Sequence, residues 1–231
     1  MRIIAGRFRR RKLLTNPGNT TRPIIDRAKV ILFDRIRDRL PGARIADLFS
    51  GTGTLGLEAL SRGAQSVVFA ERDHRAHELL RQNVAMLGAE AETLCWRVDL
   101  ARCSFLPKGD FAWTPYDVIF FDPPYASAEA IHPGDTWYRC LQQLARPHLS
   151  VPGALLVLRV GKFSEPKLPP TWQQIEVHEI ASMRIILAER VDTHDTALDD
   201  SLSESESDHT SDPSAFPDEA TSEIDSGDAP G

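Results

Sequence analysis

Apolar runs that alternate with helical segments limit the possible fold of this chain more than any other feature of its sequence. The runs are ARIADLF (43–49), SVVFAE (66–71), ETLCWRV (92–98), YDVIFF (116–121) and GALLVLRV (153–160). Most are separated by segments with apolar residues at helical spacing, such as HRAHELLRQNVAML (74–87). Strands separated by helices form a mostly parallel sheet that is covered on both faces, so the sequence predicts an α/β fold.

The two ends of the chain depart from this alternation. QQIEVHEIA (173–181) and MRIILAER (183–190) follow each other without an intervening helix, so we expect an antiparallel hairpin at the edge of a seven-stranded sheet. Residues 1–17 are predicted to form a short basic hairpin or extended arm. The spacing of apolar residues from Thr21 to Leu40 predicts an amphipathic helix whose basic residues lie mostly on other faces, namely Arg27, Lys29, Arg35, Arg37 and Arg39.

The tail at residues 191–231 has a different composition from the rest of the chain. It is rich in Asp, Glu, Ser, Thr and Pro and poor in large apolar residues, so we expect it to be disordered. The sequence therefore divides into an N-terminal extension (1–40), an α/β domain (41–190) and an acidic tail (191–231).

Charge is distributed unevenly along the chain. The net charge of −6 hides a basic body, because residues 1–190 hold all 27 Lys and Arg but only 20 of the 33 Asp and Glu. Most of the surplus base precedes residue 45. A basic surface suits a polyanionic partner such as a nucleic acid, because neutralised phosphates release condensed counterions.

The three cysteines, Cys95, Cys103 and Cys140, have neither a paired arrangement nor the spacing of metal ligands. We therefore expect no metal and a reducing, cytoplasmic location. No apolar run approaches the roughly 20 residues that span a bilayer, so no membrane association is expected. We expect a monomer.

A glycine-rich loop, DLFSGTGTLGLEAL (47–60), joins the first strand to a helix. Gly51, Gly53 and Gly56 allow a tight turn and a close ligand approach, and the helix start presents free N–H groups. Glu71 ends the next strand, where a carboxylate can accept hydrogen bonds from the hydroxyls of a ribose. The G-x-G-x-x-G spacing also fits a nicotinamide-dependent enzyme.

Asp47 favours a different cofactor. A buried acid at the end of the first strand can orient the glycine loop or meet a cationic ligand, whereas it would repel the pyrophosphate of a dinucleotide. S-adenosylmethionine carries an ammonium and a positive sulfur, so Asp47 favours it over NAD. Asp99, after the third strand, lies where an acid can bind the amino group of adenine.

The fourth strand runs into DPPY (122–125), where two prolines stop it. Asp122 and the carbonyl of Pro123 can accept hydrogen bonds from a planar exocyclic amine, while Tyr125 offers a stacking surface for its base. The predicted chemistry is an in-line displacement at a methyl carbon, catalysed by positioning and electrostatics without a metal.

Taken together, these motifs resemble the RsmD family of bacterial 16S rRNA guanine-N2 methyltransferases, over about residues 1–190. The similarity rests on MRIIAGRFRRRKL, TRPIIDRAKVILFDRI, DLFSGTGTLGLEALSRGA, VVFAERD and DVIFFDPPY, in the family's order. The glycine loop is common to many methyltransferases, whereas the N-terminal motifs are much more selective. The resemblance implies a Rossmann-like class I methyltransferase fold with an N-terminal rRNA-binding extension.

The resemblance also implies an activity, which is methylation of N2 of guanine 966 in 16S rRNA within the small ribosomal subunit or an assembly intermediate. It assigns cofactor binding to Asp47, Ser50, Gly51, Gly53, Glu71 and Asp99, and guanine binding to Asp122, Pro123, Pro124 and Tyr125. It assigns rRNA contacts to Arg2, Arg7, Arg9, Arg10, Arg11, Lys12, Arg22 and Arg27.

The chain departs from the family at several points. Arg10 stands where relatives often have glycine, and LRVGK ends the fifth strand where relatives often carry acids. The last hairpin lacks the usual glycine, and the acidic tail is additional.

Other functions remain open at the level of sequence. A DNA adenine-N6 methyltransferase shares D-P-P-Y, although this chain has no obvious insert for target recognition. A non-catalytic rRNA-binding assembly factor could keep the same fold. A nicotinamide oxidoreductase is the weakest alternative.

Overall fold

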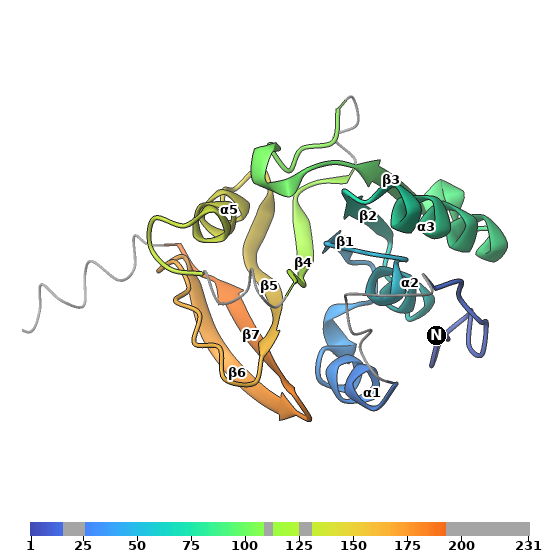
Figure 1. The fold of residues 1–231 in the computed structure, drawn as a ribbon, viewed down its shortest axis with the longest axis horizontal. Coiled ribbons are helices and arrows are strands. Elements are labelled where there is room, and N and C mark those ends of the chain that lie inside the picture. Colours follow the sequence, from blue (N-terminus) through green and yellow to red (C-terminus); the bar gives the residue numbers. More distant parts are fainter. Residues whose placement is uncertain (16–25, 109–112, 125–130, 193–231) are drawn as a thin grey trace, which may run out of the picture. The chain divides into compact units, whose positions relative to one another are not determined.

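The computed structural model describes residues 1–15, 26–108, 113–124 and 131–192. Its centre is a seven-stranded sheet with the order β3-β2-β1-β4-β5-β7-β6 (Figure 1). The strands are β1 (Arg44–Leu48), β2 (Ser66–Glu71), β3 (Thr93–Arg97), β4 (Tyr116–Phe121), β5 (Ser150–Gly161), β6 (Trp172–Ile180) and β7 (Met183–Arg190). Strands β1 to β5 are parallel, and β7 pairs antiparallel with β5 and β6. The predicted α/β fold and its edge hairpin are confirmed.

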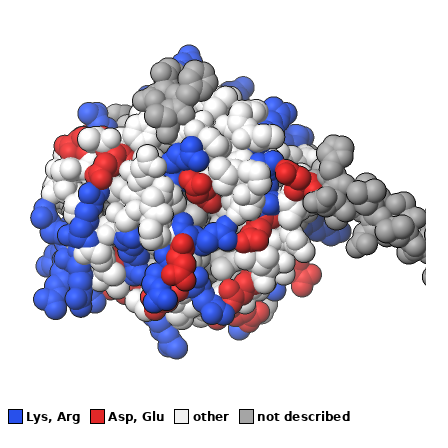
Figure 2. Space-filling model, turned by 180° about the vertical axis from the view of Figure 1, so that it is seen from behind, with Lys and Arg blue, Asp and Glu red and all other residues white. Residues whose placement is uncertain are grey.

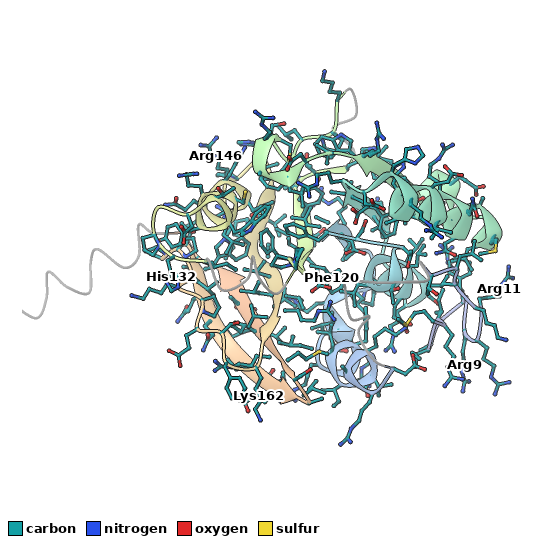
Figure 3. All side chains as sticks on the ribbon, in the orientation of Figure 1. Arg9, Arg11, Phe120, His132, Arg146 and Lys162 are labelled. Carbon is teal, nitrogen blue, oxygen red and sulfur yellow. The ribbon has the colours of Figure 1, made fainter. Side chains whose placement is uncertain are left out.

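Two hydrophobic cores lie on the two faces of the sheet. One contains apolar residues of α1 (Asp26–Arg35), α2 (Thr54–Ser61) and α3 (His74–Leu87), while the other contains those of α5 (Thr136–Leu144). Alternate residues of each strand face opposite cores, as Phe120 and Phe121 of β4 do. Phe120 is labelled near the middle of the sheet in Figure 3. Short 3₁₀ turns lie at Arg37–Arg39, Glu90–Glu92 and Leu100–Arg102.

Local signals set the ends of these elements. Asp73 caps α3, because its carboxylate accepts a hydrogen bond from the N–H of Ala76 at 2.8 Å. Gly88 ends the same helix with a φ of 64°, which glycine adopts without steric cost. Strand β4 ends at Phe121, immediately before Asp122 and the two prolines, as predicted.

The N-terminal arm is a hairpin, closed by an antiparallel bridge between Arg2 and Lys12. It packs on the sheet domain through Ile3 and Leu13, which are both buried in the first core. Its turn approaches α2 so closely that a Cβ on Gly6 would lie 1.7 Å from the carbonyl oxygen of Ser61. Only glycine fits there, which explains the glycine of the RIIAG motif.

Helix α1 is described from Asp26 to Arg35, and the predicted start of this helix, from Thr21, lies outside the described residues. Lys29 is an exception to the expected position of the basic residues on the other faces of this helix. Its side chain is fully buried, and its ammonium is compensated by the carboxylate of Glu58 at 3.6 Å and by a hydrogen bond to the carbonyl of Arg2 at 2.5 Å. Tertiary partners, which helical periodicity does not reveal, determine the orientation of this residue.

Residues 1–193 form one compact unit, so the N-terminal extension shares the core of the α/β domain. The predicted disorder of the tail concerns residues that, except for the first two, lie outside the described part of the chain. Within the described residues, no helix has the length and apolar character required to cross a membrane.

Candidate active site

The carboxyl ends of the parallel strands bring the predicted acids to one edge of the sheet. Asp47 and Glu71 lie at the ends of β1 and β2, and Asp122 directly follows β4. Strand β1 lies between β2 and β4, so these three positions are on adjacent strands. Such an edge is the usual binding site in open parallel sheets. Asp99, two residues after β3, lies farther along it.

Glu71 fixes the glycine loop. One carboxylate oxygen accepts the N–H of Gly51 at 2.8 Å, and the other accepts the N–H of Asp73 at 2.7 Å. Each oxygen has two lone pairs and keeps acceptor capacity. The end of β2 is thereby linked both to the loop and to the start of α3.

The glycines of the loop have different surroundings. A Cβ on Gly53 would lie 2.4 Å from Leu80, and one on Gly56 would lie 2.3 Å from Phe69. These two glycines therefore permit packing of α2. Gly51 has a φ of 55°, and a Cβ there would meet nothing within 4 Å. The space on the Cβ side of Gly51 is open, so the loop leaves room for a ligand there.

Asp47 is buried and accepts the N–H of Gly56 in the first turn of α2 at 2.8 Å. Burial raises the pKa of Asp47 to about 8, the neighbouring acids Asp122 and Glu71 add to the rise, and the Gly56 hydrogen bond and Arg159 oppose it. A carboxyl group with such a raised pKa ionises readily when a cation approaches. The geometry therefore accommodates both roles considered for Asp47.

Ser50 and Asp99 have local partners. The Ser50 hydroxyl donates to the carbonyl of Ala70 at 3.4 Å. Asp99 accepts the N–H of Ala101 at 3.1 Å, and its carboxylate lies 3.9 Å from Arg72. The Asp99 side chain is 37% exposed, so it is open to an additional donor.

Asp122 has a partner that sequence reasoning missed. Arg159 of β5 donates from Nε to Oδ1 of Asp122 at 2.5 Å, and the two side chains are 12% and 15% exposed. Burial raises the pKa of Asp122, and the guanidinium of Arg159 counteracts part of that rise. Pro123 is buried, Pro124 is exposed, and Tyr125 lies outside the described residues.

The sequence contained only a partial signal of this pairing. The motif LRVGK stood out as a departure from the family pattern, but the partner of Arg159 depends on strand order and register. Phe121 pairs with Leu158, so the next residues, Asp122 and Arg159, are neighbours.

A second buried charge cluster holds the arm. Both carboxylate oxygens of Glu58 in α2 accept backbone N–H groups of the arm, from Ile4 at 2.7 Å and from Ala5 at 3.0 Å. Arg62 donates to the same carboxylate at 2.8 Å, and Lys29 lies 3.6 Å away. The cluster fixes the arm to the helix that follows the glycine loop.

Asn83 of α3 also links the arm to the glycine loop. Its side-chain amide exchanges two hydrogen bonds with the backbone of Leu14, at 2.7 and 3.1 Å. The same NH₂ group donates to the carbonyl of Thr52 at 2.9 Å. Neither Glu58 nor Asn83 was among the predicted functional residues, because their partners are distant in sequence.

Three of the predicted rRNA-binding arginines already contact the protein. Arg2 and Arg7 pair with Asp26 at 3.1 Å and Glu92 at 2.5 Å, and Arg11 donates to a carbonyl at the end of α3 at 2.5 Å. These contacts hold the hairpin in place. They leave the three side chains less free for a new partner.

The remaining basic residues are available. The side chains of Arg9, Arg10, Lys12 and Arg27 are exposed and make no hydrogen bond or ion pair with other residues that the structure describes. Arg9 projects from the outer edge of the molecule in Figure 3, and Lys and Arg gather on the arm's side in Figure 2. Arg22 lies outside the described residues.

Comparison with known proteins gives consistent matches. The family model described as Conserved hypothetical protein 95 matches residues 1–188. Ribosomal RNA small subunit methyltransferase D of Escherichia coli K12 is 36% identical over 125 residues, which cover 54% of this chain and 60% of that protein. The protein of the same name from Haemophilus influenzae is 36% identical over 54% of this chain and 64% of its own length. The matched region thus spans about three fifths of these relatives.

Solved structures share the fold. A hypothetical protein of Thermus thermophilus is 29% identical, covers 82% of this chain and 99% of its own, and superposes with a TM-score of 0.61. The rRNA methyltransferase AviRa of Streptomyces viridochromogenes has the same fold at 20% identity and a TM-score of 0.55, over 77% of this chain and 88% of its own. Because the family model covers most of the chain, this protein belongs to the family described as Conserved hypothetical protein 95, the RsmD family.

Proposed function

We propose that this protein transfers a methyl group from S-adenosylmethionine to the exocyclic N2 of a guanine in small-subunit rRNA. The observation that carries the proposal is the position of Asp122 beside the end of β1, which leads into the glycine loop. Strands β1 and β4 are neighbours, and the N–H of Asp122 donates to the carbonyl of Leu48, three residues before Gly51, at 3.4 Å. An amine acceptor and a ligand loop thus adjoin at one edge of the sheet.

The residues around the loop fit S-adenosylmethionine. Open space at Gly51 admits a ligand against the backbone, and Glu71 can accept hydrogen bonds from ribose hydroxyls while it holds the loop. Asp47 would face the cationic amino-acid end, directly or through water, and Asp99 the adenine amino group. S-adenosylmethionine, when bound, supplies a methyl group on a positively charged sulfur.

The substrate side comprises the residues after β4. Asp122 and the Pro123 carbonyl accept hydrogen bonds from the N2 amine and direct its lone pair towards the methyl group. Pro123 and Pro124 stiffen this backbone, and Tyr125 stacks on the guanine. The nitrogen loses a proton during the reaction, to Asp122 or to water.

The basic arm binds and positions the RNA. Arg9, Arg10, Lys12 and Arg27 provide exposed cations for phosphates, and the arm is anchored to α2, which begins at the cofactor loop. The names of the E. coli and H. influenzae relatives support rRNA of the small subunit as the substrate class. We assign guanine 966 of 16S rRNA as the target, within the small subunit or an assembly intermediate in the cytoplasm.

A transfer assay tests this function. The protein is incubated with labelled S-adenosylmethionine and with undermethylated small subunits, free 16S rRNA or duplex DNA. Label in the small subunit or its rRNA is expected. Label in DNA alone would support an adenine methyltransferase, and a protein that binds rRNA without binding the cofactor would be an assembly factor.

A further inference from the structure

The pair formed by Asp122 and Arg159 lies at the point where the proposed reaction takes place. It joins the ends of β4 and β5 through a 2.5 Å contact between Nε and Oδ1, and both side chains are largely buried. Two charges removed from water are stable only while they contact each other, so the loss of either partner from a buried ion pair is costly. Asp122 and Arg159 therefore depend on each other in a way that an exposed ion pair does not.

The charged groups around Asp122 are mostly acids. Asp47 of β1 and Glu71 of β2 lie along the same edge, and Asp122 and Glu71 both raise the pKa of Asp47. Arg159 is the neighbouring cation that favours the ionised form of Asp122. Without it, burial would favour the protonated form of Asp122, in which one oxygen carries a proton and donates instead of accepting.

The contact also leaves one carboxylate oxygen of Asp122 available to accept a hydrogen bond. Arg159 binds Oδ1, whereas Oδ2 of Asp122 has no partner among the residues that the structure describes. Resting on the function proposed above, we propose that Arg159 is a positioning residue, which keeps Asp122 ionised and turned so that Oδ2 accepts a hydrogen bond from the substrate amine. Asp122 contacts the amine, and Arg159 acts through Asp122.

Variants of Arg159 can be compared with a matched pair on the same strand. Asp117, at the other end of β4, pairs with Arg44 of β1 at 3.1 Å. Arg44→Gln therefore removes an arginine–aspartate contact of β4 without touching the proposed site. Arg159→Gln removes the charge at the site, and Arg159→Lys keeps the charge but loses the planar guanidinium.

The first measurement needs no substrate. The ionisation of Asp122 is followed by NMR of the ¹³C-labelled carboxyl group across pH. Arg159→Gln is expected to raise the pKa of Asp122 by about 1–3 units, Arg159→Lys by less, and Arg44→Gln not at all. An unchanged titration in Arg159→Gln would overturn the proposal, whether or not the protein methylates rRNA. If that variant does not fold, an unchanged titration and rate in Arg159→Lys would overturn it.

The second measurement is the pH profile of methyl transfer under saturating cofactor. The ionised carboxylate is required, so the rate falls as pH drops through the pKa of Asp122. We expect Arg159→Gln to move this acidic limb to higher pH, by about 1 pH unit or more, with the affinity for S-adenosylmethionine retained. Arg159→Lys should keep the limb near its wild-type position with a reduced rate. A rate loss without any shift of the limb in Arg159→Gln would indicate a purely structural role.

Discussion

Two buried carboxylates of this protein, Glu58 and Asp122, both have basic partners but differ in how completely they are bonded. Glu58 has a fully buried side chain and accepts three hydrogen bonds, two from the arm and one from Arg62, with Lys29 also close. Asp122 is 15% exposed and accepts from Arg159 alone among the described residues. Bonding of Glu58 is complete, which suits a structural anchor, whereas Asp122 keeps an oxygen for a ligand.

The same comparison explains the selectivity of the N-terminal motifs. Lys29 belongs to TRPIIDRAKVILFDRI and Glu58 to DLFSGTGTLGLEALSRGA, and both contact the backbone of MRIIAGRFRRRKL. Gly6 of the arm fits only because it lacks a side chain against Ser61. Three separate motifs thus form one anchor for the arm, while DPPY belongs to the edge where chemistry is proposed.

The largest effect is expected at Asp122. Asp122→Asn removes the charged acceptor and turns part of the group into a donor, so we expect methyl transfer to fall about 10²- to 10⁴-fold. Cofactor affinity should change little, because the loop is held by Glu71 and Asp47. Single-turnover assays and calorimetric titration measure the two quantities, with Asp117→Asn as the control. A normal rate would show that Asp122 is not the amine acceptor.

Glu58→Gln should instead affect the fold. It leaves Lys29 buried without its countercharge, which we expect to lower the free energy of unfolding by about 3–5 kcal/mol. Denaturant unfolding measures the loss, and hydrogen exchange at the amides of Ile4 and Ala5 should accelerate. The double variant Glu58→Gln with Lys29→Met should recover part of the stability. If the single variant were as stable as the wild type, the buried contacts of Glu58 would contribute little to the stability of the fold.

Much of the fold follows from local sequence patterns. The predicted bounds of β2, β4, β7 and α3 agree with the structure, because apolar alternation, prolines and glycine caps act over a few residues. The burial of Lys29 was not predictable, since its partner Glu58 lies on another helix. The pairing of Arg159 with Asp122 required the register between β4 and β5. Local patterns thus locate the site, and tertiary pairing sets its charge state.

Asp47 offers a third, more moderate effect. Its raised pKa of about 8 means that the folded protein holds a proton which the unfolded chain releases near pH 4. Its contribution to stability is therefore present below the unfolded value and is lost as pH rises through about 8. A cationic cofactor favours the ionised form, so affinity for S-adenosylmethionine should rise with pH below 8, by at most about tenfold per unit. Titration calorimetry across pH measures this, and Asp47→Asn should flatten the dependence. A flat wild-type profile would exclude contact between Asp47 and the cationic end of the cofactor.

The smallest effect is expected in the arm. Arg10 has a φ of 70°, a left-handed backbone conformation that costs a residue with a side chain about 1 kcal/mol. Arg10→Gly should leave the protein slightly more stable, by less than about 1 kcal/mol, and should weaken rRNA binding. The plot of log affinity for rRNA against log salt concentration should become less steep by roughly one unit of slope, which corresponds to about one phosphate contact. Arg37→Gly on an exposed 3₁₀ turn serves as the control. Unchanged binding would remove Arg10 from the RNA interface.

The most direct test of the central claim is the chemical identity of the product. Undermethylated small subunits are treated with the protein and S-adenosylmethionine, and their rRNA is digested to nucleosides for mass spectrometry. The account predicts N2-methylguanosine with the wild type and little or none with Asp122→Asn. Methylation of another base, or equal product from the two proteins, would contradict it.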